Sequence, residues 1–155
     1  MELRVEDLRK SYGGAAVLQS VSFTAGIGLT RVTGSSGIGK TTLLRILLGL
    51  GRADGGATNA DRFRWAAVFQ EDRLLEQLDA AGNLRFALGA AYDEAAARAL
   101  LAPSDALALD EPFTGLDADN RAAAQRCVAR AAREKIVLLV SHEDDALTGA
   151  EVRLQ

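Results

Sequence analysis

The chain has 155 residues, of which 48% are hydrophobic and 25% are charged, and its formal net charge is −3. These values are typical of one soluble domain with its own core, and they argue against disorder over most of the chain. No basic run indicates nucleic acid as a partner, and no stretch reaches the ~18 consecutive apolar residues of a membrane span. The charged start is unlike a signal peptide. The single cysteine, Cys127, excludes an internal disulfide and fits a reducing compartment.

Short apolar segments along the chain predict the strands of a sheet. Residues 3–5 and 21–23 predict an antiparallel pair near the amino end. Four further segments predict buried strands, namely residues 29–33, 65–69, 106–109 and 136–140. The last two of these are nearly continuous apolar runs, as is typical of a parallel sheet that is covered on both faces.

Helices are predicted between these strands. Residues 41–50 and 117–133 predict two of them, and an Ala-rich segment over residues 93–101 predicts a third that ends before Pro103. On the longest helix one apolar face holds Ala123, Cys127, Val128 and Ala131, so Cys127 is expected in the core. Residues 51–60 read GRADGGATNA and predict a loop. Strands that alternate with helices predict an α/β fold with a mainly parallel sheet and a small antiparallel sheet at the amino end.

Residues 34–41 read GSSGIGKT and match the P-loop pattern G-x-x-x-x-G-K-S/T. Glycines let the backbone curl so that its N–H groups face a phosphate, and the following helix adds its positive end. Lys40 is expected to neutralise the β- and γ-phosphates, and the Thr41 hydroxyl is expected to reach Mg²⁺. The residues assigned to the nucleotide are Gly34, Ser35, Ser36, Gly37, Ile38, Gly39, Lys40, Thr41 and Thr42.

A pair of acidic residues ends the predicted strand at residues 106–109. Taken alone, such a pair is more often a turn or a helix cap. After a P-loop, however, a neighbouring strand must supply a carboxylate for Mg²⁺, and Asp110 suits that role. Glu111 is one residue further along and is expected to face the γ-phosphate, where it could polarise the attacking water.

These motifs together resemble the ATP-binding cassette (ABC) ATPases, the motor subunits of ABC transporters. DEP at residues 110–112 and GLD at residues 115–117 are similar to the second nucleotide motif and the D-loop of that family. Gln70 resembles the Q-loop glutamine and His142 the switch histidine. Tyr12 resembles the aromatic residue that stacks on adenine. The resemblance runs over nearly the whole chain.

The resemblance implies an ATPase that uses ATP and Mg²⁺ and couples hydrolysis to transport. It assigns catalysis to Glu111, His142 and Gln70, and the metal to Thr41, Gln70 and Asp110. The implied partners are a transmembrane permease and a second cassette, with the chain in the cytoplasm on the inner face of the membrane. The run FQEDRLL at residues 69–75 is similar to cassettes of nitrate, sulfonate and taurine importers.

One departure from the family concerns the segment between Gln70 and Asp110. No LSGGQ or close variant is present there, and the interval is much shorter than the family usually has. Residues 1–155 are therefore predicted to form one nucleotide-binding domain in which residues 71–103 are a shortened remnant of the helical arm. Because a partner cassette's LSGGQ normally covers the γ-phosphate, hydrolysis by this chain alone is expected to be weak.

Several functions remain open at this point. The leading reading is a shortened ABC ATPase that energises transport through a separate permease. A second is a nucleotide-binding subunit that pairs with an intact cassette and contributes little catalysis. A soluble cassette relative is a third, against which the acidic charge and the lack of a coiled-coil insertion count. The fourth is an internally deleted form without function.

Overall fold

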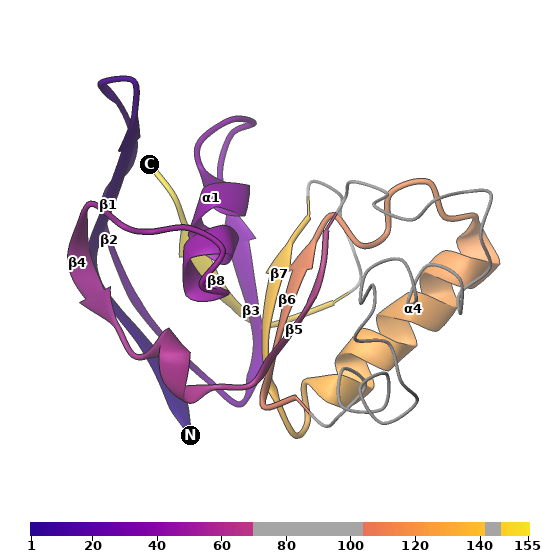
Figure 1. Cartoon of the computed structure of the whole chain (residues 1–155). Helices are drawn as coiled ribbons and strands as arrows, with labels where there is room; N and C mark the ends of the chain where they lie inside the picture. The colour runs from indigo at the N-terminus through magenta and orange to yellow at the C-terminus, as the bar shows by residue number, and fades with distance from the viewer. Residues whose placement is uncertain (70–103, 142–146) are drawn as a thin grey trace, which may run out of the picture. The chain divides into compact units, whose positions relative to one another are not determined.

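The computed structural model describes residues 1–69, 104–141 and 147–155. Within these residues a three-stranded antiparallel sheet and a five-stranded parallel sheet lie on either side of one helix (Figure 1). The elements, in chain order, are β1 (Glu2–Tyr12), β2 (Ala15–Gly26), β3 (Gly28–Thr33), α1 (Lys40–Leu47), β4 (Gly55–Thr58), a 3-10 turn (Ala60–Arg62), β5 (Trp65–Val68), β6 (Ala106–Asp110), α4 (Ala118–Ala131), β7 (Ile136–Val140) and β8 (Ala150–Arg153).

The parallel sheet has the strand order β5-β6-β7-β3-β8, and every pair of neighbours in it is parallel. The four strands expected from apolar runs are confirmed, and β7 has the bounds that its sequence predicted. The edge strand β8 was not predicted, because its sequence, AEVR, carries no apolar run. The α/β class and the mainly parallel sheet are thus confirmed.

Side chains of the parallel sheet alternate between two hydrophobic clusters, one on each face. In β7, Ile136, Leu138 and Val140 belong to the cluster that includes α1 and the antiparallel sheet. Val137 and Leu139, between them, belong to the cluster that includes Val128 of α4. Because both faces are covered, β7 is buried at all five positions.

Helix α1 follows the P-loop directly and ends earlier than predicted. It was expected over residues 41–50, but its last helical residue is Leu47. Gly49 has a φ of 73°, and the Leu50 amide donates to the Arg45 carbonyl at 2.8 Å. The Gly49 amide also donates to the Ile46 carbonyl at 3.0 Å. These bonds form a Schellman motif, in which a left-handed glycine ends the helix and satisfies its last carbonyls.

The antiparallel sheet has the order β2-β1-β4 and is larger than its sequence indicated. The predicted pairing of its first two strands is confirmed, with Val5 opposite Phe23. The prediction of a loop over residues 51–60 was wrong, because β4 lies within it and pairs with β1. Two of the four residues of β4 are glycines, which weaken the sequence signal for a strand.

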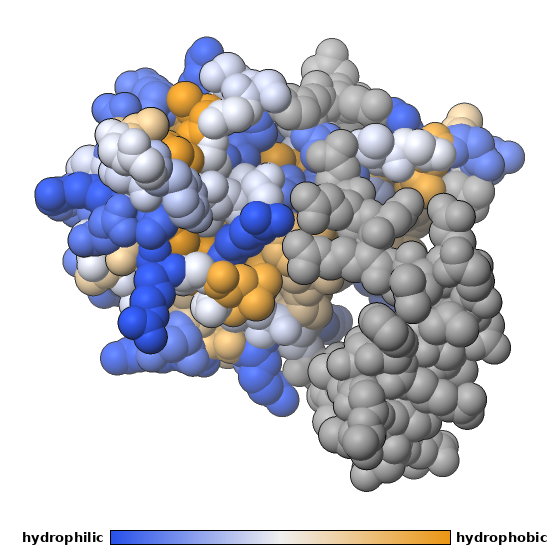
Figure 2. All heavy atoms as spheres, turned by 45° about the horizontal axis from the view of Figure 1, so that its top comes forward, coloured by the Kyte–Doolittle hydropathy of each residue, from blue (hydrophilic) through white to orange (hydrophobic). Residues whose placement is uncertain are grey.

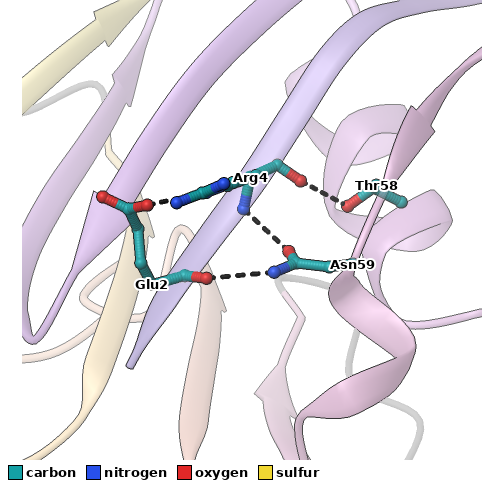
Figure 3. Close-up of polar contacts among 4 residues, drawn as sticks. All are labelled: Glu2, Arg4, Thr58 and Asn59. Carbon is teal, nitrogen blue, oxygen red and sulfur yellow. Dashed lines mark hydrogen bonds and ion pairs between the residues drawn. The ribbon is translucent and has the colours of Figure 1, made fainter.

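Side chains next to β4 hold it against β1 (Figure 3). The Asn59 amide group accepts from the Arg4 amide at 2.8 Å and donates to the Glu2 carbonyl at 3.1 Å. The Thr58 hydroxyl donates to the Arg4 carbonyl at 2.9 Å. Asn59 therefore continues the backbone ladder with its side chain after the strand has ended, which a sequence pattern does not reveal.

Helix α4 confirms the predicted helix over residues 117–133 with slightly shorter bounds. The expectation for Cys127 was wrong, because this side chain is exposed. Val128 is the buried residue among the side chains of the helix that the structure describes, and Ala124 and Ala131 pack against the same cluster. Ala124 and the residues four and seven positions after it therefore form the inner face of the helix. Cys127 lies about 100° around the helix axis from Val128 and is outside that face.

The surface of the described residues is mixed in character. On the face that Figure 2 shows, hydrophilic residues surround small, separate hydrophobic patches. The large hydrophobic residues that are exposed in the described part of the chain are far apart in sequence, namely Met1, Tyr12, Ile27, Leu50 and Val68. No helix among the described residues is long and apolar enough to cross a membrane.

One ion pair sets the start of the β5–β6 pairing and leads to a prediction about acid stability. Arg64 donates to both Asp105 carboxylate oxygens, from Nη2 at 3.0 Å and from Nε at 3.1 Å. The hydrogen bonds from Arg64 lower the pKa of Asp105 from 3.8 to about 2. The unfolded chain takes up a proton near the ordinary pKa, but the folded chain does not. The stabilisation of the folded chain by the Arg64–Asp105 ion pair is therefore fully present above about pH 4 and is lost as the pH falls toward 2.

We expect Arg64→Met to raise the pKa of Asp105 back toward its ordinary value. The measurement is a carboxyl-carbon NMR titration of both proteins. Arg62→Met, two residues earlier in the chain, is the control and should leave the titration of Asp105 unchanged. A wild-type pKa at the ordinary value would contradict the prediction.

Candidate functional site

The P-loop residues and the acidic pair meet in one pocket. The parallel strands end at the same edge of the sheet, where α/β folds place their ligands. A pocket of about 220 Å³ lies at that edge. The residues that line it are Ser36, Gly37, Gly39, Lys40, Thr41, Thr42, Asp110, Glu111 and Val140. The predicted P-loop is thus set between a strand and a helix, as its pattern requires. Asp110, the last residue of β6, and Glu111, which follows it, also line the pocket. The expectation that the strand next to the P-loop strand supplies these acids was wrong, because β7 lies between β6 and β3.

Lys40 is buried beneath the loop that precedes it. Its side chain is 7% exposed, and its ammonium group donates to the Gly34 and Ser35 carbonyls, each at 2.9 Å. The positive charge is thereby held inside the curve of the loop. An anion that enters the pocket meets this ammonium group together with the backbone N–H groups at the amino end of α1.

Thr41 and Asp110 join the P-loop helix to strand β6. The Thr41 hydroxyl donates to Asp110 Oδ2 at 2.6 Å, and Asp110 is only 4% exposed. The two residues are far apart in sequence, yet the pairing of β6 with β7 and of β7 with β3 brings them together. A hydroxyl and a carboxylate side by side are hard oxygen donors, which is the donor set that Mg²⁺ prefers.

Glu111 lies at the turn that follows β6. Its backbone has a φ of 52°, which is in the left-handed region that residues other than glycine rarely adopt. The turn is held because the Glu111 amide donates to the Val140 carbonyl at 2.9 Å and its carbonyl accepts from the Thr114 amide at 3.2 Å. This backbone conformation turns the chain out of the sheet while the side chain of Glu111 still lines the pocket.

Gly39 brings the antiparallel sheet into contact with the P-loop. It caps α1 with a φ of 108°. A Cβ atom there would lie 2.8 Å from Leu18 Cδ2 and 2.9 Å from both the Val17 carbonyl oxygen and Val17 Cγ1. Strand β2 therefore approaches the loop as closely as a glycine allows. The sequence pattern requires this glycine, but only the fold shows that β2 is its neighbour.

Other predicted residues lie outside this pocket. Gly34, Ser35 and Ile38 line an adjacent hollow of about 520 Å³ on the side of β8. Tyr12, at the end of β1, is 56% exposed, and Lys10 Nζ lies 5.1 Å from its ring centroid. Figure 1 shows the β1–β2 hairpin and the loop before α1 reaching the same end of the view.

Two of the predicted catalytic residues lie outside the part of the chain that the structure describes. These are Gln70 and His142, and the proposed remnant of the helical arm, residues 71–103, lies there too. Val140 lines the pocket although the motifs did not single it out. Its position as the last residue of β7, directly before the Ser-His pair, was the available signal.

The pocket at the P-loop is not the largest hollow of the described residues. One of about 670 Å³ lies along β1 and β4 of the antiparallel sheet and the turn that follows β4. It is lined by Glu2, Arg4, Glu6, Ala57, Thr58, Asn59, Asp61 and Arg62. Acidic and basic side chains alternate there, and no residue of the P-loop reaches it. The smaller pocket is the one in which a buried lysine, a hydroxyl and two carboxylates converge.

Comparison with known proteins agrees with this geometry. A family model described as an AAA ATPase domain matches residues 15–148. The aliphatic sulfonates import ATP-binding protein SsuB of Corynebacterium glutamicum is 33% identical, over 90% of this chain and 73% of its own length. SsuB 3 of Nocardia farcinica is 35% identical, over 96% of this chain and 74% of its own length. This chain belongs to the ATP-binding subunits of ABC transporters.

Solved structures show the same fold for this ABC subunit. An ATP-binding subunit of an ABC transporter superposes with a TM-score of 0.73 at 22% identity, over 92% of this chain and 80% of the other. A Pyrococcus furiosus protein described as an ABC transporter ATP-binding protein also gives 0.73, at 18% identity, over 99% of this chain and 98% of its own. The P-loop fold with a small antiparallel sheet is therefore confirmed. The family and its ATPase character are confirmed by the relatives named above.

The ABC subunit is shorter than its relatives within the region that aligns. The alignment with the Corynebacterium protein extends over 178 positions, which is more than the 155 residues of this chain. The alignment with the Nocardia protein extends over 184 positions. Both relatives therefore hold residues that stand opposite gaps in this sequence.

The close contact at Gly39 generates a prediction about stability. Gly39→Ala adds a methyl group that meets the backbone of Val17, which cannot move without disturbing β2. Gly37→Ala is the matched control, because Gly37 also has a positive φ, of 76°, but an added Cβ meets nothing within 4 Å. We expect Gly39→Ala to lower the free energy of unfolding by about 1–3 kcal/mol more than Gly37→Ala does.

Urea denaturation of the two variants and the wild type measures this difference. Equal losses in the two variants would show that backbone strain alone matters at these glycines. The contact between β2 and the P-loop would then make no measurable contribution to the free energy of unfolding.

Proposed function

We propose that this chain binds ATP at the P-loop and hydrolyses it to drive solute import through a separate permease. The observation that carries the proposal is the convergence of Lys40, Thr41, Asp110 and Glu111 in one pocket at the amino end of α1. The triphosphate would enter beside Lys40, whose ammonium group would exchange its two carbonyl partners for phosphate oxygens. The stacking of adenine on the exposed ring of Tyr12 is part of the same proposal.

Mg²⁺ is the cation that these residues suit. Thr41 and Asp110 would hold it, and the 2.6 Å hydrogen bond between them shows that both oxygens already lie together. The ion would neutralise charge on the phosphate oxygens. Gln70 is proposed as a further ligand by family resemblance.

Glu111 is the proposed partner of the attacking water. The water oxygen bonds to the γ-phosphorus while the bond from that phosphorus to the bridging oxygen breaks, which yields ADP and phosphate. Glu111 would orient the water and accept its proton, and its place beside Asp110 in the same pocket supports this role. His142 is proposed to contact the γ-phosphate.

The Lys40 interaction generates a direct test of ATP binding. Lys40→Ala removes the positive charge from the phosphate site. We expect affinity for ATP to fall at least about tenfold, which corresponds to ~1.4 kcal/mol. Lys135→Ala is a matched control, because Lys135 lies just before β7, at the opposite end of that strand from the pocket, where its ammonium group contacts Ser104.

Isothermal calorimetry with Mg-ATP measures both variants against the wild type. The control should bind as the wild type does. Equal affinity of Lys40→Ala and wild type would remove the basis for a phosphate site at the P-loop.

The proposed partners follow from the family. The relatives named above are import ATP-binding proteins, and another, of Rhodococcus jostii, is an Fe(3+) ions import ATP-binding protein at 30% identity. Import is what these names share, whereas their solutes differ. We therefore propose import with a transmembrane permease that selects the solute, and a place for this subunit on the cytoplasmic face of the membrane.

A second candidate function is a subunit that depends on an intact cassette for catalysis. The absence of LSGGQ between Gln70 and Asp110 favours it, and so do the additional positions that the relatives hold in the alignment. We propose that residues 71–103 are a shortened arm within a single domain. A pair of such chains would leave both γ-phosphates uncovered by donors from the partner.

This proposal predicts slow turnover by the pure protein. Loss of a charge-stabilising element that acts in trans costs about 10³–10⁵ in rate in comparable phosphoryl-transfer enzymes. We expect ATP binding with almost no steady-state release of phosphate. Addition of a cassette that has LSGGQ should raise the release, and the gain should disappear when this chain carries Glu111→Gln.

Phosphate release over a range of protein concentrations provides the measurement. Turnover of the pure protein that rises with the square of its concentration and disappears in Glu111→Gln would contradict the prediction. That result would mean that another segment of this chain replaces LSGGQ.

A further inference from the structure

The end of the edge strand β8 meets the start of the P-loop. Strand β8 lies parallel to β3, with Arg153 opposite Thr33. The Leu154 amide donates to the Thr33 carbonyl at 2.9 Å, so the ladder extends to the residue that precedes Gly34. The Thr33 hydroxyl also donates to the Glu151 carboxylate at 2.7 Å. Thr33 is therefore held to β8 by both its backbone and its side chain.

Gly34 is in close contact with this strand end. Its φ is 142°, and an added Cβ would lie 3.1 Å from the Leu154 carbonyl oxygen and 3.5 Å from Leu154 Cβ. Ile38 approaches the same point, with its Cγ2 atom 3.0 Å away. Leu154 itself is 6% exposed and belongs to the hydrophobic cluster that contains Val32. The first glycine of the loop thus rests on the backbone of a residue that is anchored in the core.

The Gly34 carbonyl is held by Lys40, the residue proposed to bind the phosphates of ATP. The Gly34 carbonyl accepts from the Lys40 ammonium group at 2.9 Å. Phosphate oxygens compete for that ammonium group, since charged acceptors form stronger hydrogen bonds than neutral carbonyls do. The contacts between Gly34 and Leu154 do not involve the Lys40 ammonium group.

From this arrangement we infer that Leu154 is a positioning residue for the nucleotide site. It holds the Gly34 peptide in the orientation that phosphate binding needs, at the moment when Lys40 turns to the ligand. Strand β8 therefore serves the site without touching ATP. The inference rests on the proposed binding of ATP at the P-loop, because positioning has meaning only if the loop binds phosphate.

A matched pair of core truncations separates positioning from stability. Leu154→Ala keeps the carbonyl oxygen and Cβ that lie near Gly34 but removes the side-chain atoms that anchor them in the core. Leu3→Ala makes the same chemical change in the same hydrophobic cluster, but Leu3 lies in β1 opposite Ala25. Leu154→Met keeps the volume and serves as the conservative rescue. All variants are made in the full chain, and circular dichroism at a temperature well below unfolding establishes that each is folded.

Calorimetry with Mg-ATP gives the readout. We expect Leu154→Ala to weaken binding about tenfold, because small displacements of a binding group carry large costs. Leu3→Ala and Leu154→Met should bind as the wild type does. Equal affinity of Leu154→Ala and Leu3→Ala would overturn the inference. If Leu154→Ala does not fold, Leu154→Val replaces it, with a smaller loss of affinity expected and unchanged affinity overturning the inference.

Lys40→Ala in the same series separates this inference from the proposed function. Wild-type binding that does not depend on Lys40 would mean that the P-loop proposal has failed. Binding that depends on Lys40 but not on Leu154 would leave the proposed function intact and refute only the role of Leu154.

Discussion

The hydrogen bond from Thr41 to Asp110 is the interaction on which the site depends. It joins the first turn of α1 to the last residue of β6, at the edge where the parallel strands end. Both partners are oxygen donors that a divalent cation can use, and Asp110 is almost fully buried. A buried carboxylate is tolerated only where hydrogen bonds or charges compensate its loss of water. The hydrogen bond from the Thr41 hydroxyl contributes to that compensation.

The surrounding structure holds the loop from three sides. Strand β2 packs against Gly39, and the residue that follows β8 packs against Gly34. The Lys40 ammonium group lies inside the loop and bonds to its carbonyls. Each of these contacts reaches backbone atoms, so the loop is constrained by neighbours that cannot shift cheaply. A preorganised phosphate site of this kind loses little free energy to ordering when its ligand binds.

Because this chain belongs to the ABC subunits, most of the ATP site is expected within the chain itself and one part, the LSGGQ motif, is expected from a second cassette. Within one chain the P-loop, the acidic pair at the end of β6 and the last residue of β7 line the pocket. The element that covers the γ-phosphate in this family comes from a second cassette, and no LSGGQ motif is present in this sequence. Binding and hydrolysis therefore place different demands on this chain. We propose that its own residues bind ATP and that hydrolysis depends on preorganised donors that a partner would add.

The sequence alone determined the P-loop, the acidic pair, the family and the main strands, because each rests on local spacing or on an apolar run. It could not reveal the pairing of β8 with β3, the hydrogen bond of Asn59 to Glu2 or the contact of Leu154 with Gly34, since these join residues far apart in the chain. The exposure of Cys127 was likewise decided by the direction in which α4 packs. Helical periodicity places residues on a common face, but only the position of the sheet decides which face is buried. Tertiary packing alone thus determined which backbone atoms support the loop.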